Sequence, residues 1–242
     1  MRPLILAKYH FASLWNWRTS YLARFIEPVA YLLFLSTGLR ASLESRTGPY
    51  SEFVLAGMVC LLAFRAATAS MSDVANDRKW GVFAVYTLQG GSAVGYVASV
   101  LVFACSVFLG QFVLLSLCAL LAFADARPDP DVLVAQAGLG VLLVVGWCGF
   151  GAALGGKVDS YSARDFVVTV TSLPVVLAAP LFYPIDGGWL RIVAAVNPLT
   201  YQVDALRGPS IGWLVTLAGW AIAGVAVAVV NLRRTERLSR ER

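Results

Sequence analysis

Charged side chains are scarce in this sequence of 242 residues. Lysine, arginine, aspartate and glutamate together make up 14% of the chain, whereas an average soluble domain contains about 25%. Apolar residues reach 59% and occur in blocks that are too long for the core helices of a soluble protein. The composition therefore excludes a soluble enzyme and predicts an all-α membrane protein.

Residue types that support catalysis or metal binding are also rare. His10 is the only histidine, which excludes Ser-His and Cys-His nucleophile pairs and most zinc sites. The four cysteines all lie inside apolar blocks: Cys60, Cys105, Cys118 and Cys148. They lack C-x-x-C spacing, so we expect small core side chains rather than disulfides or a metal site. We expect no cofactor or metal on this chain.

Two further absences concern nucleotides and nucleic acids. The sequence contains no G-x-x-x-x-G-K-[ST] pattern, so we do not expect the chain to bind and hydrolyse ATP in the P-loop manner. The formal net charge of +5 is modest, and the basic residues are dispersed between the apolar blocks as juxtamembrane charges are. We therefore expect no nucleic-acid partner.

Six apolar blocks are each near or above the length that crosses a bilayer as a helix. They cover residues 21–39, 53–72, 94–123, 132–156, 166–183 and 211–232. Of the 19 lysines and arginines, 13 flank one set of block ends and five flank the other, which places both termini in the cytoplasm. We expect one domain over residues 1–242, with six spans in the cell membrane.

The N-terminal lead-in, residues 1–20, is too polar to span. Residues 3–17 predict an amphipathic helix that lies in the cytoplasmic interface. Its expected apolar stripe consists of Leu4, Ala7, Phe11, Leu14 and Trp15. Leu6 and Trp17 lie off this stripe. The alternative is an irregular amphiphilic lead-in.

A cytoplasmic loop, residues 73–93, combines charges with aromatic residues. We predict a short helix over residues 76–89 that docks another protein through apolar anchors, with charges at the rim. The residues assigned to this surface are Asp77, Arg78, Lys79, Trp80 and Phe83. The alternative is a loop helix that packs on its own bundle.

An external segment, residues 184–209, predicts two short re-entrant helices that narrow the outer mouth of a path. The first covers residues 189–196, and Asn197-Pro198 is typical of the cap and first residue of the second. Leu199, Val203 and Leu206 form one apolar edge of the second helix, and Asp204 and Arg207 are expected on its polar face. Trp189 and Tyr201 complete the residues assigned to this gate.

Two ionisable residues lie well inside the expected spans, Glu27 in the first and Arg65 in the second. Consecutive antiparallel helices are usually neighbours, and both residues lie about 10 Å from the cytoplasmic end of their span. We therefore expect an ion pair, because an unpaired charge in the bilayer is costly. The alternatives are that each side chain extends separately to the interface, or that the pair contacts a substrate.

Three stretches share residues with a known family. These residues are Glu27-Pro28 and Tyr31-Leu32-Leu33 near the start, Arg78, Gly81 and Val82-Phe83 in the loop, and Tyr183-Pro184, Trp189-Leu190, Asn197-Pro198-Leu199, Tyr201 and Ala205-Leu206-Arg207 in the external segment. Together they resemble the type-2 ABC transporter permeases, which include polysaccharide, lipo-oligosaccharide and antibiotic exporters. Ala84 departs from the family pattern, which often has Glu in the coupling loop.

The resemblance implies the transmembrane subunit of an ATP-driven exporter. Two permeases, identical or different, would pair with two cytoplasmic ATPase subunits that hold ATP and magnesium. We expect an amphiphilic substrate, and favour a drug-like or natural-product-like molecule over a lipid-linked glycan. A glycan would require an aromatic ladder along the path, for which Trp147 with Phe150, or Tyr31 with Phe34, are candidates.

Two other function classes stay open. A secondary transporter normally shows internal repeats, and none is visible here. An intramembrane enzyme needs a base near a nucleophile within the spans. An ATPase subunit that copurifies with the chain and is stimulated by it would separate the exporter from both alternatives.

Overall fold

The computed structural model describes residues 2–16, 18–47, 49–123, 128–158 and 160–240, and these residues contain helices and no strands. The ten helices within them are α1 (Arg2–Asn16), α2 (Arg18–Thr47), α3 (Tyr50–Lys79), α4 (Val82–Leu88), α5 (Ala93–Ala122), α6 (Pro130–Gly155), α7 (Tyr161–Leu177), α8 (Gly188–Val196), α9 (Pro198–Arg207) and α10 (Ile211–Arg240). The expectation of an all-helical chain is confirmed for this part of the sequence.

Five of these helices are long and apolar enough to cross a membrane. They are Leu22–Thr47 within α2, the whole of α3, α5 and α6, and Ile211–Arg234 within α10. The expected fifth span, residues 166–183, differs. Here α7 is 17 residues long and ends at Leu177, because the chain turns at Ala178 ahead of Pro180. At 1.5 Å per residue it is about 26 Å long, slightly shorter than a typical hydrocarbon core.

Helix starts follow local capping chemistry. The Ser92 hydroxyl accepts a hydrogen bond from the backbone N–H of Gly95 at the start of α5, and the Ser160 hydroxyl accepts one from Ala163 at the start of α7. Asp129 caps α6, whose first residue is Pro130. These side chains satisfy backbone donors that the first turn of a helix leaves without intrahelical partners.

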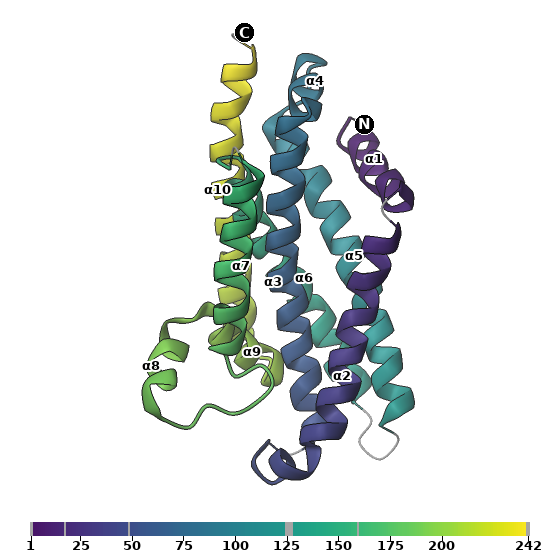
Figure 1. Ribbon diagram of the computed structural model, residues 1–242, viewed down its shortest axis with the longest axis vertical. Helices are drawn as coiled ribbons and strands as arrows, with labels where there is room; N and C mark the ends of the chain where they lie inside the picture. The colour runs from purple at the N-terminus through teal and green to yellow at the C-terminus, as the bar shows by residue number, and fades with distance from the viewer. Residues whose placement is uncertain (1, 17, 48, 124–127, 159, 241–242) are drawn as a thin grey trace.

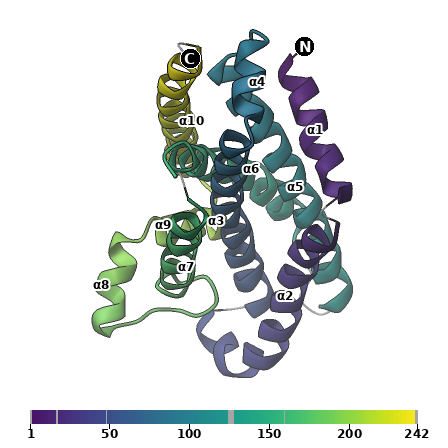
Figure 2. The same cartoon turned by 45° about the horizontal axis from the view of Figure 1, so that its top comes forward.

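The centre of the bundle is a layer of three helices, with α6 between α3 and α10 (Figure 1; Figure 2). Glycines on α6 allow backbone-to-backbone contact on both sides. A Cβ atom at Gly151 would collide with the Ala67 carbonyl of α3, and one at Gly149 would collide with the Gly224 backbone of α10. Close approach through small residues is the usual way in which helices associate inside a membrane.

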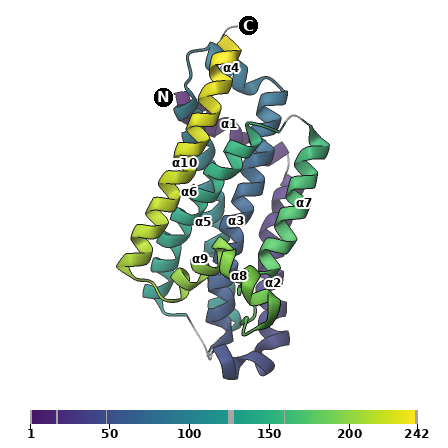
Figure 3. The ribbon, with the colours of Figure 1, turned by 90° about the vertical axis from the view of Figure 1, so that its left-hand side faces the viewer.

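The two ends of the bundle are formed by different helices. Both chain ends and α4 lie at one end, whereas α8 and α9 lie towards the other (Figure 1; Figure 3). Two apolar clusters match these ends. One surrounds α3 with α5, α6 and α9, and the other joins Leu6, Phe83, Tyr86 and Tyr96 beside α4.

The expected N-terminal helix forms as α1, but only part of its predicted apolar stripe packs inward. Leu6 and Ala7 are buried, while Leu4 and Trp15 are largely exposed. The reason is that α1 packs along α5, where the Phe11 ring meets Phe103 edge-to-face at 5.2 Å. A partner helix decides which of several apolar residues turns inward.

Candidate functional site

The loop assigned to protein docking is divided between two helices. The expected helix over residues 76–89 does not form as one piece, because α3 continues to Lys79 and α4 begins at Val82. Gly81 separates them with a φ of 78°, a backbone conformation that glycine adopts without steric cost. The chain therefore turns sharply after Trp80, and α4 folds back against the bundle.

The two aromatic residues assigned as docking anchors have opposite environments. Phe83 is only 1% exposed, and its ring meets Tyr96 edge-to-face at 4.9 Å. Its assignment as an anchor for a partner is therefore wrong, because Phe83 and Tyr86 share the inward face of α4. Trp80 is 61% exposed. The alternative of a helix packed on its own bundle describes the inner face of α4.

An exposed apolar edge lies on the other face of this region. Its members are Trp80, Val82, Val85 and Leu88. The buried aromatic side chains hold α4 in place from the inside, so the outer edge has a fixed position. Exposed apolar side chains grouped in this way are typical of an interaction surface.

The charged residues of the loop mainly fasten the end of α3. The Tyr96 hydroxyl donates to Asp77 Oδ2 at 2.7 Å, and His10 Nε2 lies 3.8 Å from the same oxygen. Arg78 donates to the Gly155 carbonyl at 3.2 Å. Lys79 is exposed. Burial lowers the pKa of His10, and the nearby Asp77 carboxylate opposes part of that shift.

The external helices form as the sequence predicts. Asn197 caps α9 by accepting a hydrogen bond from the Leu199 backbone N–H at 3.0 Å, and Pro198 is the first helical residue. The Asn197 amide also donates to the Val175 carbonyl of α7 at 2.6 Å. The predicted apolar edge, Leu199, Val203 and Leu206, is fully buried.

Two aromatic residues assigned to the gate lie on the outside of this pair of helices. Trp189 is 74% exposed on α8. Tyr201 is half-exposed on α9, and its hydroxyl donates to the Ala195 carbonyl at 2.6 Å.

Arg207 occupies a different place from the one expected. It was assigned to the polar face of α9 beside Asp204, but its guanidinium turns inward and donates to the carbonyls of Pro180 at 2.8 Å and Leu181 at 3.2 Å. The guanidinium carbon also lies 3.4 Å from the ring centre of Phe53. Burial lowers the pKa of Arg207 to about 10. The carbonyls after α7 accept these hydrogen bonds, and the sequence of α9 alone does not reveal them.

The structure brings Glu27 and Arg65 into direct contact. The two guanidinium nitrogens Nη1 and Nη2 donate to the two carboxylate oxygens, both at 2.7 Å. This geometry is bidentate, the strongest arrangement of such a pair. The Tyr31 ring centre lies 6.0 Å from the guanidinium carbon of Arg65.

Arg65 lines a pocket of about 600 Å³ between α2, α3, α5 and α7. Arg24, Asp73 and Gln111 also line it, and the Gln111 amide donates to the Arg24 carbonyl at 2.9 Å. Sequence reasoning did not identify these three residues. The available signal was the three-residue spacing of Arg24 and Glu27, which places both on one side of α2.

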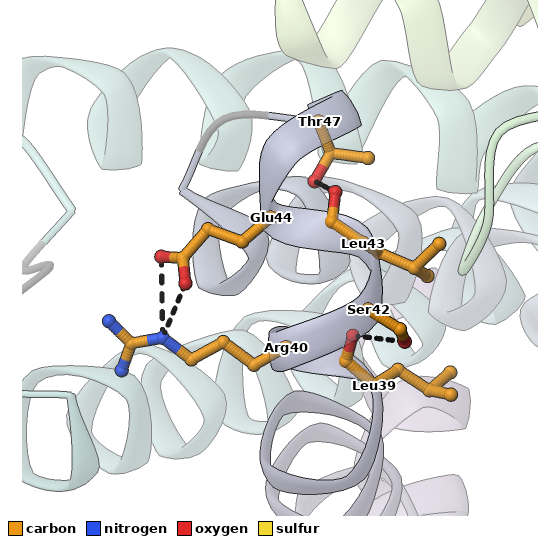
Figure 4. Close-up of polar contacts among 6 residues, drawn as sticks. All are labelled: Leu39, Arg40, Ser42, Leu43, Glu44 and Thr47. Carbon is orange, nitrogen blue, oxygen red and sulfur yellow. Dashed lines mark hydrogen bonds and ion pairs between the residues drawn. The ribbon is translucent and has the colours of Figure 1, made fainter.

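A second ion pair on α2 provides a local contrast. The Arg40 Nε donates to both Glu44 carboxylate oxygens, at 3.1 and 3.3 Å, within a single helix (Figure 4). The neighbouring hydrogen bonds are also local, from Ser42 to the Leu39 carbonyl and from Thr47 to the Leu43 carbonyl (Figure 4). This pair does not line the pocket.

The aromatic residues considered for a path separate into two groups. Trp147 is engaged in helix packing, because its indole N–H donates to Gln202 at 2.8 Å and its ring meets Phe64 and Trp220. Phe150 also meets Trp220. Tyr31 lines the pocket and stacks with Phe182 at 6.4 Å.

Metal-binding and disulfide chemistry find little support in the described residues. Among them, no group of three or more histidine, cysteine, aspartate or glutamate side chains could hold a metal ion. The four cysteines are free thiols, and two of them are buried.

Comparison with known proteins gives two matches. The family model described as ABC-2 type transporter matches residues 4–209, from α1 to just beyond the end of α9. A protein of Porphyra purpurea named as a transport permease, ycf38, is 22% identical over 205 residues. The alignment covers 81% of this chain and 69% of that relative.

Proposed function

Because this chain belongs to the ABC-2 type transporter family, and is thus a membrane permease rather than an enzyme, we propose that it is the transmembrane subunit of an ATP-driven exporter. A separate cytoplasmic ATPase would bind and hydrolyse ATP with magnesium. Two copies of the ATPase would act on two permeases, which pair as a homodimer or a heterodimer. The resident membrane would be the cell membrane.

The observation that carries this proposal is the exposed apolar edge formed by Trp80 and the outer face of α4. Phe83 and Tyr86 pack α4 against its own bundle. Trp80, which precedes α4, and Val82, Val85 and Leu88 on the outer face of α4 stay exposed. A docking surface that transmits force has to be fixed to the helices it moves, and α4 meets this requirement because it packs on both α3 and α10. We assign this edge as the ATPase contact, with Lys79 at its rim.

The proposed topology has six spans with both termini in the cytoplasm, and α7 serves as the fifth. Its length of about 26 Å supports a span in a slightly thinned bilayer or one completed by the residues that follow. It runs along the side of the bundle and contacts α3 (Figure 3). Both chain ends lie at the same end as α4, as a shared cytoplasmic side requires (Figure 1).

The proposed substrate is an amphiphile. Support comes from the pocket, whose walls are mainly apolar with a few charged groups, as in sites that bind small amphiphilic molecules. The engagement of Trp147 and Phe150 in helix packing removes one of the two candidate aromatic ladders. This favours a drug-like or natural-product-like substrate over a lipid-linked glycan.

The test is reconstitution of the chain with a candidate ATPase subunit. We expect the two proteins to copurify, and the permease to stimulate ATP hydrolysis and the export of an amphiphilic dye from vesicles. Transport that persists without any ATPase and follows an ion gradient would overturn the proposal in favour of a secondary transporter.

A further inference from the structure

The pocket between α2, α3, α5 and α7 has a polar part and an apolar part. Arg24 and Leu39, which both line it, are 15 residues apart along α2, or about 22 Å at 1.5 Å per residue. Arg65, Arg24 and Asp73 supply charge in the half nearer to α4, and leucines such as Leu39 and Leu61 supply the wall in the other half. This shape fits one elongated molecule with a polar head and an apolar tail.

The two members of the Glu27–Arg65 pair differ in how firmly they are placed. Arg65 lies on α3, the most buried of the candidate spans, and lines the pocket. Glu27 lies on α2, the least buried span, and its side chain is 46% exposed compared with 37% for Arg65. A ligand in the pocket can therefore reach Arg65 and compete with Glu27 for its hydrogen bonds, because Arg65 lines the pocket whereas Glu27 does not.

Charge complementarity then selects the ligand. An incoming anion takes over both guanidinium hydrogen bonds that Glu27 leaves, so Arg65 stays paired. The charged side chains that line the pocket are two cations, Arg24 and Arg65, and one anion, Asp73, so the lining attracts an anion more strongly than a cation. The planar guanidinium also matches carboxylate and phosphate groups geometrically.

We propose that this pocket binds an amphiphile with an anionic head group, which exchanges with Glu27 for the Arg65 guanidinium. The inference rests on the proposed transport function and specifies its substrate class. The bidentate pair at 2.7 Å engages both Nη1 and Nη2 of the guanidinium, and Tyr31 lies beside the guanidinium on the side of α2. Glu27 is then an internal competitor that occupies the head-group position until a ligand arrives.

Direct binding tests this proposal without an ATPase. The full chain, in nanodiscs of zwitterionic lipid, is titrated with three radiolabelled amphiphiles that share a dodecyl chain. They are dodecyl phosphate, dodecyltrimethylammonium and dodecyl maltoside, and empty nanodiscs correct for partition into lipid. We expect saturable binding in which dodecyl phosphate is about tenfold tighter than the other two, since charged hydrogen bonds of this kind are worth that much.

Variants of the ion pair distinguish a Glu27 that exchanges with the ligand from a Glu27 that only stabilises the fold. Glu27→Gln removes the internal competitor, so dodecyl phosphate should bind several-fold more tightly. Arg65→Gln should abolish the preference for the anion. The double variant Glu27→Gln/Arg65→Gln leaves no unpaired charge, should also lose the preference, and carries the test if Arg65→Gln does not fold. Arg40→Gln and Glu44→Gln, which break the other ion pair of α2, should leave binding unchanged.

The contrary outcomes are distinct. Equal binding of the three amphiphiles, tighter binding of the cation, or weaker anion binding in Glu27→Gln would each overturn the anionic site. Failure of the ATPase to copurify would overturn the proposed function but would leave these titrations unaffected.

Discussion

Two short helices, α4 and α9, pack against opposite parts of the bundle, and they relate differently to their own sequences. The apolar residues of α9 lie on one edge, and Asn197 fixes its first turn. In α4 the apolar residues surround the helix, so Phe83 is buried while Val82 and Val85 are exposed. Spacing therefore identifies the inner face of a helix only where polar residues occupy the other face.

The largest expected effect tests the inner face of α4. Phe83→Ala removes a fully buried ring at the Tyr96 contact, and truncations of this kind cost about 3–5 kcal/mol. Thermal and denaturant unfolding of the detergent-solubilised protein measures the loss. Trp80→Ala truncates an exposed aromatic side chain three positions before Phe83. It should change stability by less than about 0.5 kcal/mol. Equal losses in the two variants would show that α4 has no preferred inner face.

The second effect tests the outer face of the same region. Trp80→Ala should weaken the binding of the ATPase subunit by about 2 kcal/mol, or about 30-fold in Kd, as expected for a central aromatic anchor. The matched control is Trp189→Ala, at another largely exposed tryptophan, on α8. Binding measured by biolayer interferometry should be unchanged in the control, and a Trp80→Ala variant that binds normally would contradict the proposed contact.

The third effect tests α9 through its cap. Asn197→Ala removes the bond to Leu199 and the bond to the Val175 carbonyl, so stability should fall by about 1 kcal/mol. Asn231→Ala provides a control, because Asn231 donates only to the Val227 carbonyl of its own helix and should cost almost nothing. Unfolding midpoints that shift equally in the two variants would argue against a special role for the cap.

The smallest effect is a dependence of stability on pH at the α4 end. Burial lowers the folded-state pKa of His10 below the ordinary value of 6.5. The neutral ring therefore contributes stability above pH 6.5, which is lost as the pH falls through the lower folded pKa. The unfolding free energy of the native chain should drop relative to that of His10→Gln between pH 7 and pH 5. Parallel curves would show that His10 does not titrate differently on folding.

The sequence predicted the features that depend on local chemistry or on the depth of a residue within its span. Long apolar runs located five spans, and Asn197-Pro198 located the start of α9. Matching depth in consecutive helices located the contact between Glu27 and Arg65. Each of these signals is complete within one or two adjacent helices, so no knowledge of the rest of the fold was needed.

The features that the sequence did not predict depend on partners far along the chain. Leu6 turns inward because α5 is there, and Arg207 turns inward because it donates to the carbonyls of Pro180 and Leu181. The shorter α7 follows from the turn at Ala178. The pocket required four helices at once, so its residues could not be grouped from spacing along any single one.

The glycine contacts of α6 have a mechanical consequence. At the contacts of Gly149 with Gly224 and of Gly151 with Ala67, the two backbones touch directly. No side chain lies between them that could change its rotamer when one helix moves against the other. The layer of α3, α6 and α10 therefore behaves as a stiff plate. If α4 is the ATPase contact proposed above, a displacement of α4 acts directly on α3 and α10, the two outer helices of the plate. By contrast, α2 meets α3 partly through the long side chains of Glu27 and Arg65, and the exchange of partners proposed above would loosen this contact while the plate stays intact.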